Sequence, residues 1–382
     1  MRQADVIVIG AGVLGTFHAY FAAQKGCTTL LIERNAFPND ASTRNFGIIA
    51  QSLVDPASEW AACARATRDI YRSIQQRHDI SVQVTGSLYV ASTDAEKAVL
   101  QEFALRFAAD YRCTYLDAHD ALSRYPFIQE MYCTGALLFP DDLTLDPRRM
   151  LRRLIPYVAQ TGGVDYVPHT TAVAVEPSGR QCRVKDARGD VYVADRVIIC
   201  SGADYRTLFP DIFRTSGLQL CKLQMMQTVP LPGFHLPHAI LSGLSLQRYP
   251  AFTSCPSYGL LAAQTIDEDV RAYGIHLLFK QAVDGSVVIG DSHEYRDWTD
   301  AGLLEEMTNC AINEAILTYA RQMLRLPSWT IQTMWNGYYL VSPGRDMFSE
   351  TIDGAIHIVT GTGKGMTIGP GFAQQHIEAI LT

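Results

Sequence analysis

The sequence predicts an α/β fold in two domains, one built on a doubly wound parallel sheet and the other on an antiparallel sheet. Three observations support this prediction. A strand, a glycine-rich turn, a helix and a second strand follow one another near the amino terminus, and strand-like segments recur from about residue 164 to residue 200. The chain has 382 residues, which is more than one hydrophobic core usually supports.

The first strand, Val6–Ile9, leads through a glycine-rich turn into a helix predicted over Val13–Lys25, and Thr28–Ile32 forms the second strand. The turn has the spacing G-x-G-x-x-G in the strand-to-helix context that the motif requires. One glycine permits the tight turn, one lets a pyrophosphate approach the main chain, and one lets helix and strand pack closely. The pattern predicts a Rossmann-like site for an adenine dinucleotide, formed by Gly10, Gly12, Val13, Leu14 and Gly15.

An acidic residue ends the second strand, where the ribose of such a ligand is expected. Glu33 follows Gly15 by 18 residues, and its carboxylate is suited to accept hydrogen bonds from both ribose hydroxyls. The same charge disfavours a 2′-phosphate, which makes NADP a poor candidate. Arg34 is adjacent and is expected beside the same ligand.

Charge and composition exclude several classes of partner. The net charge of −7 argues against nucleic acid or an anionic membrane, and an anionic substrate needs a local cluster of positive groups. No apolar run approaches the roughly 20 residues that a membrane span needs. Nine cysteines occur without a C-x-x-C pair, so we expect no zinc ribbon, no bound metal, no disulfide framework and a reducing, cytoplasmic environment.

A second glycine-rich stretch, GTGKGMTIGPG at Gly361–Gly371, precedes a helix-like run near the carboxy terminus. Glycine loses the most backbone entropy on folding, so this concentration indicates that a ligand approaches the main chain closely. Backbone N–H groups and the positive end of the following helix stabilise negative charge by roughly 1–2 kcal/mol.

The order of these segments resembles the D-amino-acid oxidase, glycine oxidase and sarcosine oxidase family of FAD-dependent amine oxidoreductases. The resemblance rests on the first turn, STRNFG, GSLYVAS, IICSGA and GTGKGMT. It implies a Rossmann-like FAD-binding domain of the glutathione-reductase type and a substrate domain with an antiparallel sheet. The expected FAD-binding segments are 1–80, 145–220 and 328–382, and the expected substrate-domain segments are 81–144 and 221–327.

The resemblance also implies which residues hold the flavin. Main-chain amides of the last motif surround the pyrimidine edge of the ring, and Lys364 adds a charge there. Arg44 is either beside the flavin, at a phosphate or in solvent. No cysteine occurs in TMWNGYYLVSPG, where some relatives attach their flavin, so noncovalent FAD is expected. The remaining predicted cofactor residues are Ser42, Asn45, Phe46, Gly47, Val173 through its main chain, Ser201, Gly202, Gly337, Gly363, Gly365, Met366 and Thr367.

In such enzymes a neutral amine loses hydride to the flavin, and water hydrolyses the resulting imine, so no acid or base residue is obligatory. We therefore expect His276, His293 and His357 to be structural. The family's lysine that promotes reaction with oxygen is replaced within Val287–Ile289, so the electron acceptor, oxygen or another, stays open.

Substrate binding is expected to differ from that of glycine oxidase-like relatives, which clamp a carboxylate with an arginine where this chain has Tyr339. Predicted catalytic residues are Lys364, Tyr339 and Arg345, and the predicted substrate-binding residues are Tyr338, Tyr339, Lys222, Gln224, Lys280 and Arg345. The segment 231–259, rich in Pro, Gly and Ser, is expected to line or cover the pocket.

CKLQMM, WNGYYLVSPGRD and GTGKGMT together resemble a family branch associated with aminophosphonate breakdown. That likeness implies an anionic amine such as 2-aminoethylphosphonate, or an N-methyl or hydroxylated derivative. Three alternatives stay open: a glycine, sarcosine or D-amino-acid oxidase, a 2-hydroxyacid dehydrogenase, and a flavin-loaded subunit without turnover.

Overall fold

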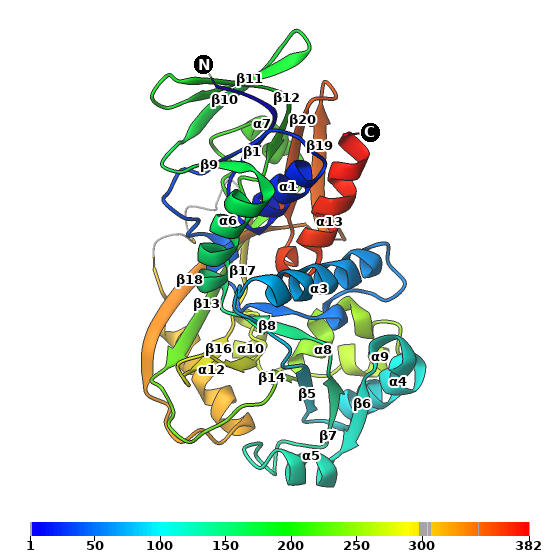
Figure 1. Cartoon of the computed structure of the whole chain (residues 1–382). Helices are drawn as coiled ribbons and strands as arrows, with labels where there is room; N and C mark the ends of the chain where they lie inside the picture. The colour runs from blue at the N-terminus through cyan, green and yellow to red at the C-terminus, as the bar shows by residue number, and fades with distance from the viewer. Residues whose placement is uncertain (1, 298–303, 305–306, 343, 382) are drawn as a thin grey trace.

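The computed structural model describes residues 2–297, 304, 307–342 and 344–381. In this part of the chain, three sheets form the framework, with the first and second sheets towards opposite ends of the molecule. Both chain termini lie at the end that holds the first sheet (Figure 1). The mixed α/β fold, with a Rossmann-like sheet and a separate, mainly antiparallel sheet, confirms the predicted fold class.

The first sheet has eight strands in the described residues, in the order β10-β11-β12-β1-β2-β9, with β20 beside β12 and β19 beside β20. Its centre is parallel, since β1 pairs with β2 and β12, and β12 pairs with β20. Parallel strands that are buried on both faces have continuous apolar sequences, as β1 has at Val6–Ile9. The strands are β1 (Arg2–Ile9), β2 (Thr29–Ile32), β9 (Val164–Val167), β10 (Ala172–Ser178), β11 (Gln181–Asp186), β12 (Val191–Ile199), β19 (Met347–Ile352) and β20 (Ile356–Gly361).

Helices α1 (Val13–Gln24) and α13 (Gly365–Ile380) lie side by side at this sheet, although they come from opposite ends of the chain (Figure 1). Helix α1 is buried from Val13 to Ala22, which explains its nearly uniform apolar sequence. Close packing depends on Gly369, where an added Cβ would lie 3.0 Å from Leu14. Helices α6 (Pro147–Gly162) and α7 (Pro210–Thr215) also lie near this sheet, and α3 (Trp60–Arg77) packs against α13.

The second sheet has nine strands in the described part of the chain, in the order β17-β13-β16-β15-β14-β5-β7-β6, with β18 paired to β13. All its pairs are antiparallel except β14 with β5. The strands are β5 (Ser87–Ala91), β6 (Thr114–Asp117), β7 (Gly135–Phe139), β13 (Gln219–Thr228), β14 (Ala239–Ser242), β15 (Leu278–Gln281), β16 (Val287–Gly290), β17 (Glu294–Asp297) and β18 (Ile331–Val341).

Six helices among the described residues accompany this sheet: α4 (Asp94–Tyr111), α5 (Ala118–Arg124), α8 (Leu244–Arg248), α9 (Tyr258–Ala262), α10 (Glu268–Ala272) and α12 (Cys310–Met323). Helix α4 begins with a capping box, in which Thr93 and Glu96 bond reciprocally to the first turn. The third sheet has three strands in the order β3 (Ile48–Ile49), β8 (Leu143–Leu145) and β4 (Val82–Gln83). Its strand β3 comes directly after the short helix α2 (Ala41–Arg44) in the chain.

The proposed division into two domains stays a prediction. The residues of strand β18 fall in the predicted carboxy-terminal FAD-binding segment. The strand itself, however, pairs with β13 of the second sheet, so the predicted domain boundary does not follow the boundary between the sheets. Both β13 and β18 belong to the second sheet, and residues of both strands line the cavity described next.

Candidate active site

The amino-terminal turn has no room for side chains at its glycines. Gly10 has φ +95°, and an added Cβ would lie 2.4 Å from the carbonyl oxygen of Cys200. An added Cβ at Gly15 would lie 1.8 Å from the carbonyl oxygen of Gly10, so this glycine lets α1 approach the turn. Gly12 is the N-cap of α1. The amino end of the helix therefore meets a cavity through backbone N–H groups, as anion binding requires.

Glu33 is 6% exposed and is held by two main-chain donors at the end of β2. The amide of Ala11 donates to Oε2 at 3.0 Å, and the amide of Asn35 donates to Oε1 at 2.9 Å. Each oxygen keeps a second lone pair, so a diol remains a suitable partner. Arg34 also lines the cavity and pairs with Asp40 at 2.5 Å.

One large cavity, with a volume of about 1090 Å³, is lined by residues from both ends of the chain. This volume lies at the upper end of the range for ligand pockets and suits a dinucleotide together with a small substrate. Residues of the first turn and of the carboxy-terminal loop both contribute to its wall. Predicted cofactor residues in that wall are Gly10, Gly12, Val13, Leu14, Glu33, Arg34, Ser42, Asn45, Phe46, Gly47, Ser201, Gly202, Gly363, Lys364, Gly365, Met366 and Thr367.

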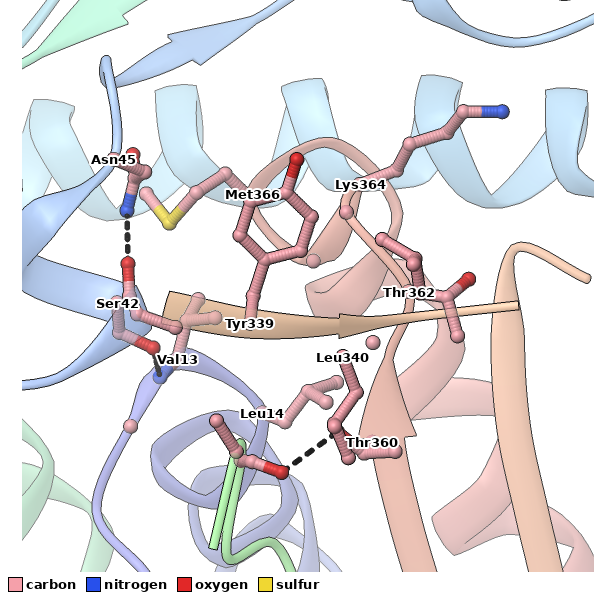
Figure 2. Close-up of a pocket in the computed structure, with 18 of the residues that line it drawn as sticks. Val13, Leu14, Ser42, Asn45, Tyr339, Leu340, Thr360, Thr362, Lys364 and Met366 are labelled. Atoms are coloured by element: carbon pink, nitrogen blue, oxygen red, sulfur yellow. Dashed lines mark hydrogen bonds between the residues drawn. The ribbon is translucent and has the colours of Figure 1, made fainter. Parts of the chain in front are cut away.

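The carboxy-terminal loop turns into α13 beside Tyr339 (Figure 2). Gly363 has φ +92°, and an added Cβ would lie 3.1 Å from the Tyr339 ring. The first N–H groups of a helix lack intrahelical partners and carry partial positive charge, so the start of α13 offers donors to the cavity. The side chain of Lys364 runs away from Tyr339, and its Nζ lies 2.6 Å from Asp346. The Asp346 carboxylate compensates the positive charge of Lys364. This contact argues against the prediction that Lys364 adds a positive charge at the flavin.

Four predicted cofactor residues do not line the cavity. The Arg44 guanidinium donates to the carbonyl oxygens of Asn39 at 2.6 Å and Asn336 at 3.2 Å, so it is a structural link. Gly337 makes room for the same segment, since its added Cβ would lie 2.9 Å from the Arg44 carbonyl. Gly15 acts through packing, as described above. Val173 is 42% exposed, and the wall at that point is formed by Thr170, Thr171 and Ala172.

Most predicted substrate-binding residues also lie outside the cavity. The Lys222 ammonium donates to the Met307 carbonyl at 2.5 Å and lies 3.5 Å from Glu294. The Gln224 side chain bonds to Asn309 and Asn313. Tyr338 does not line the cavity either, whereas Tyr339 and Arg345 do, Arg345 on an exposed loop. For Lys222, Gln224 and Tyr338 the prediction is wrong because their side chains lie outside the cavity wall.

Lys280 is buried beneath the cavity floor rather than exposed in it. Its ammonium donates to the carbonyl oxygens of Leu145 and Gly47 and lies 5.3 Å from the centre of the Phe46 ring. Burial lowers the pKa of Lys280 to about 7. Lys280 is absent from the wall of the large cavity and borders a smaller pocket together with Phe46 instead. A direct contact between this residue and a substrate stays a prediction that the lining of the large cavity does not support.

The sequence reasoning missed Arg248, the last residue of α8, whose guanidinium lines the cavity. It donates to the hydroxyl of Tyr295 at 2.9 Å and to the hydroxyl of Tyr339 at 3.2 Å. Among the described residues, no carboxylate forms a salt bridge with it. Burial opposes its charge, but the neighbouring phenols and Asp291 raise the pKa of Arg248 above its ordinary value. A permanent cation thus faces the cavity without a carboxylate partner.

The second missed feature is a buried cluster of His276, Asp291 and His293 in the same cavity wall. Nε2 of His276 lies 3.0 Å from Oδ1 of Asp291, and Nε2 of His293 lies 3.8 Å from Oδ2. The expectation that these two histidines are structural stays a prediction, although both border the cavity. His357, in contrast, lies outside the cavity wall. Sequence spacing gave no signal, since His276 and Asp291 belong to different strand ends.

A cavity closed by a dinucleotide-binding turn at one end and by helix-terminal amides at the other defines a flavin-dependent oxidoreductase. The comparison with protein families agrees: a model described as FAD dependent oxidoreductase (DAO) matches residues 5–378. The chain belongs to this family. Its cofactor is FAD, and it is an FAD-dependent oxidoreductase.

Among known proteins, the chain is similar to a glycine oxidase of Bacillus licheniformis, with 22% identity over 88% of this chain and 81% of that protein. It is also similar to a monomeric sarcosine oxidase of Bacillus sp. (strain B-0618), with 23% identity over 71% of this chain and 73% of that protein. The crystal structure of glycine oxidase from Geobacillus kaustophilus has the same fold, with a TM-score of 0.79, 16% identity, and 99% of this chain and 95% of that chain covered.

The residues that line the cavity are suited to bind FAD. Glycines stand where a Cβ would clash at the first turn, a buried carboxylate stands at the end of β2, and α13 points its amino end at the cavity. Which atoms of FAD each residue contacts stays a prediction. Within the described residues, no helix combines the length and apolar character that a membrane crossing needs.

Proposed function

We propose that this enzyme oxidises a small amine that carries an anionic group, with 2-aminoethylphosphonate or its N-methyl or hydroxylated derivative as the substrate class. The observation that carries this proposal is Arg248, a cavity-facing guanidinium whose acceptors are two neutral phenols rather than a carboxylate. An ionised partner from the substrate completes the arrangement, because a hydrogen bond between opposite charges is stronger than one to a neutral phenol. The relatives named glycine oxidase and sarcosine oxidase support an amine as the donor.

The positions of the donors favour a phosphonate over a carboxylate. Arg248, Tyr295 and Tyr339 come from α8, β17 and β18, and the two hydroxyls lie within hydrogen-bond distance of the one guanidinium. A phenol that accepts a hydrogen bond from Arg248 still has its own proton to donate. A cluster of three donor groups suits the three oxygens of a phosphonate, whereas a planar carboxylate is best held by one free guanidinium fork.

Bound FAD supplies the hydride acceptor for the amine's C–H bond. The chain's own contribution is to hold the anion at Arg248 and to keep the amine and its carbon within the enclosed part of the cavity. Loss of hydride leaves an imine, and water then converts it to an aldehyde and the released amine or ammonia. The final electron acceptor, oxygen or another compound, is left open by the proposal.

Three other functions would use the same scaffold differently. A glycine, sarcosine or D-amino-acid oxidase would hold a carboxylate at Arg248 or Arg345. A 2-hydroxyacid dehydrogenase would oxidise an alcohol there, and a subunit without turnover would bind FAD only. A reducing, cytoplasmic setting is part of the proposal, supported by nine cysteines that all lack a disulfide partner.

The test is anaerobic bleaching of the FAD absorbance by 2-aminoethylphosphonate, glycine, sarcosine, D-alanine and 2-hydroxy acids in parallel. Fastest bleaching by the phosphonate is the expected result. Faster bleaching by glycine or D-alanine contradicts the phosphonate assignment, bleaching by hydroxy acids alone favours the dehydrogenase, and no bleaching with any compound favours a subunit without turnover.

A further inference from the structure

The cluster of His276, Asp291 and His293 has no role in the proposed binding of the anion. The three residues are 4%, 6% and 5% exposed, and all of them line the cavity that contains Arg248 and Tyr339. His276 precedes β15, while Asp291 and His293 follow β16. Two neighbouring strand ends thus bring three titratable groups to one point of the wall.

The hydrogen bonds of His293 fix where its proton lies. Its Nδ1 is 3.1 Å from the carbonyl oxygen of Gly274, and because a carbonyl only accepts, Nδ1 is the donor. A neutral His293 therefore carries its lone pair on Nε2, on the side of Asp291. An unprotonated nitrogen and a carboxylate face each other across 3.8 Å.

Asp291 is not satisfied within the protein. Its Oδ1 has no hydrogen-bond partner of suitable geometry among the described residues, although Nε2 of His276 lies 3.0 Å away. A buried polar atom without a partner costs free energy and usually marks a place where a ligand or proton enters. The wall thus presents two basic atoms, Nε2 of His293 and a carboxylate oxygen that no donor of suitable geometry satisfies.

The surrounding groups leave few other sites for that proton. Burial raises the pKa of the Tyr249, Tyr295 and Tyr339 phenols, and it raises the pKa of the Cys221 thiol to about 12, so all four stay protonated. Burial raises the pKa of Asp291, while the charges of His293 and Arg248 oppose that rise. Arg248 is the cation that acts on all three members of the cluster. Since a divalent metal ion would lie near this guanidinium, a proton suits the cluster better than a metal.

We propose that His293, oriented by Gly274 and supported by Asp291, accepts the proton that the ammonium group of the substrate loses before its C–H bond is broken. In this step an N–H bond of the ammonium breaks, its electron pair stays on the substrate nitrogen, and a new N–H bond forms at Nε2 of His293. The resulting imidazolium is stabilised by the Asp291 carboxylate. This inference rests on the proposed function, because it requires an amine substrate.

Binding of the substrate anion and uptake of the proton are coupled through Arg248. Burial lowers the pKa of His293, the charge of Arg248 lowers it further, and Asp291 raises it. An anion bound at Arg248 offsets the effect of that cation, so the imidazole becomes more basic when the correct substrate is present. Burial also disfavours the charged ammonium of the bound substrate, which assists the transfer.

The experiment measures the limiting rate of anaerobic FAD reduction by 2-aminoethylphosphonate from about pH 6 to about pH 10, a range that spans the ordinary pKa values of imidazole and of an ammonium group. His293→Gln is expected to reduce the rate about 100-fold near neutral pH, with recovery as the pH rises and free amine accumulates. An analogue fluorinated next to the amine carbon has a less basic amine that is largely neutral at the same pH. This analogue is expected to reduce the FAD of the variant and of the wild type at similar rates. That result would also show that the variant is folded.

His357→Gln is the matched control, because His357 is buried but lies outside the cavity wall, and its pH profile is expected to equal that of the wild type. Asp291→Asn is expected to shift the profile in the same direction as His293→Gln. An unchanged pH profile in His293→Gln, a change confined to KM, an equal loss with both substrates, or a stoichiometric divalent metal in the purified enzyme would each overturn the proposal. If no amine reduces the wild-type enzyme, the proposed function falls together with this inference. Reduction of the wild type with an unchanged profile in the variant contradicts this inference alone.

Discussion

The guanidinium of Arg248 donates to the hydroxyl of Tyr339 across 3.2 Å, although the two residues are separated by 91 positions in the chain. The resemblance to glycine oxidase-like enzymes led us to expect a carboxylate-binding arginine at the position of Tyr339. A positive charge borders this cavity from α8 instead. Under the proposed function, Arg248 takes over the binding of the substrate anion.

Arg248→Gln is expected to lower kcat/KM for anionic amines by about 10-fold to 100-fold, since a hydrogen bond to a charged group contributes roughly 1.5–3 kcal/mol. Rates with a neutral amine of similar size are expected to change little. Anaerobic reduction kinetics with both substrates give the comparison. An equal loss for the neutral amine would show that Arg248 supports the fold and not the anion.

Tyr339→Phe removes one acceptor of Arg248 but keeps the ring that packs beside Gly363. The expected cost is about 1 kcal/mol in substrate binding, or roughly a fivefold rise in KM, with FAD content unchanged. Tyr338→Phe is the control, because that side chain lies outside the cavity wall. Comparable effects in the two variants would contradict the assigned role of Tyr339.

Gly363→Ala is expected to weaken FAD binding, because Gly363 has φ +92° and a new Cβ would press on Tyr339 at 3.1 Å. Gly354→Ala is the matched control, with φ +68° and no atom within 4 Å of its new Cβ. Both variants carry the cost of a left-handed backbone, about 1–3 kcal/mol. FAD content and Tm are measured for each, and only Gly363→Ala should lose FAD beyond its loss of stability.

The buried Lys280 predicts a pH dependence of stability. Burial lowers its pKa in the folded state to about 7, below the ordinary value of 10.5, so between these two values the unfolded chain binds more protons. The contribution of Lys280 to the free energy of unfolding therefore rises as the pH increases from about 7 towards about 10, and it is unfavourable below that window. Lys280→Met should flatten this rise.

Urea unfolding of the wild type and of Lys280→Met at several pH values in that window provides the measurement. Identical slopes of unfolding free energy against pH in the two proteins would mean that Lys280 keeps its proton in the folded state. The two carbonyl acceptors of its ammonium, Leu145 and Gly47, would then be sufficient to hold the charge.

The cofactor end of the site was predictable because its signals are local. Gly10, Gly12 and Gly15 fall within one turn, and Glu33 ends the next strand, so spacing alone relates them. The glycines of the carboxy-terminal loop follow the same logic, since a Cβ at Gly363 would meet a neighbour. Where another group must lie close to the backbone, the sequence has a glycine, and such positions can be recognised from the sequence alone.

The substrate end was not predictable in the same way, because side chains alternate between the two faces of a strand. On β13, Gln219 and Leu223 line the cavity, while Lys222 and Gln224 point to the other face. The sequence therefore identified the correct strand, β13, but Lys222 lies on the face of that strand that does not border the cavity. Arg248 ends a short helix in the segment expected to line the pocket, but no motif distinguishes it from other arginines.

The wall of the cavity combines the first turn of the chain with the start of its last helix, α13. Because α1 is synthesised long before α13, the cavity has its full wall only after α13 has been made and has packed against α1. We therefore expect FAD to be retained only after that packing has occurred, and a chain that stops within α13 should be purified without the yellow colour of bound FAD.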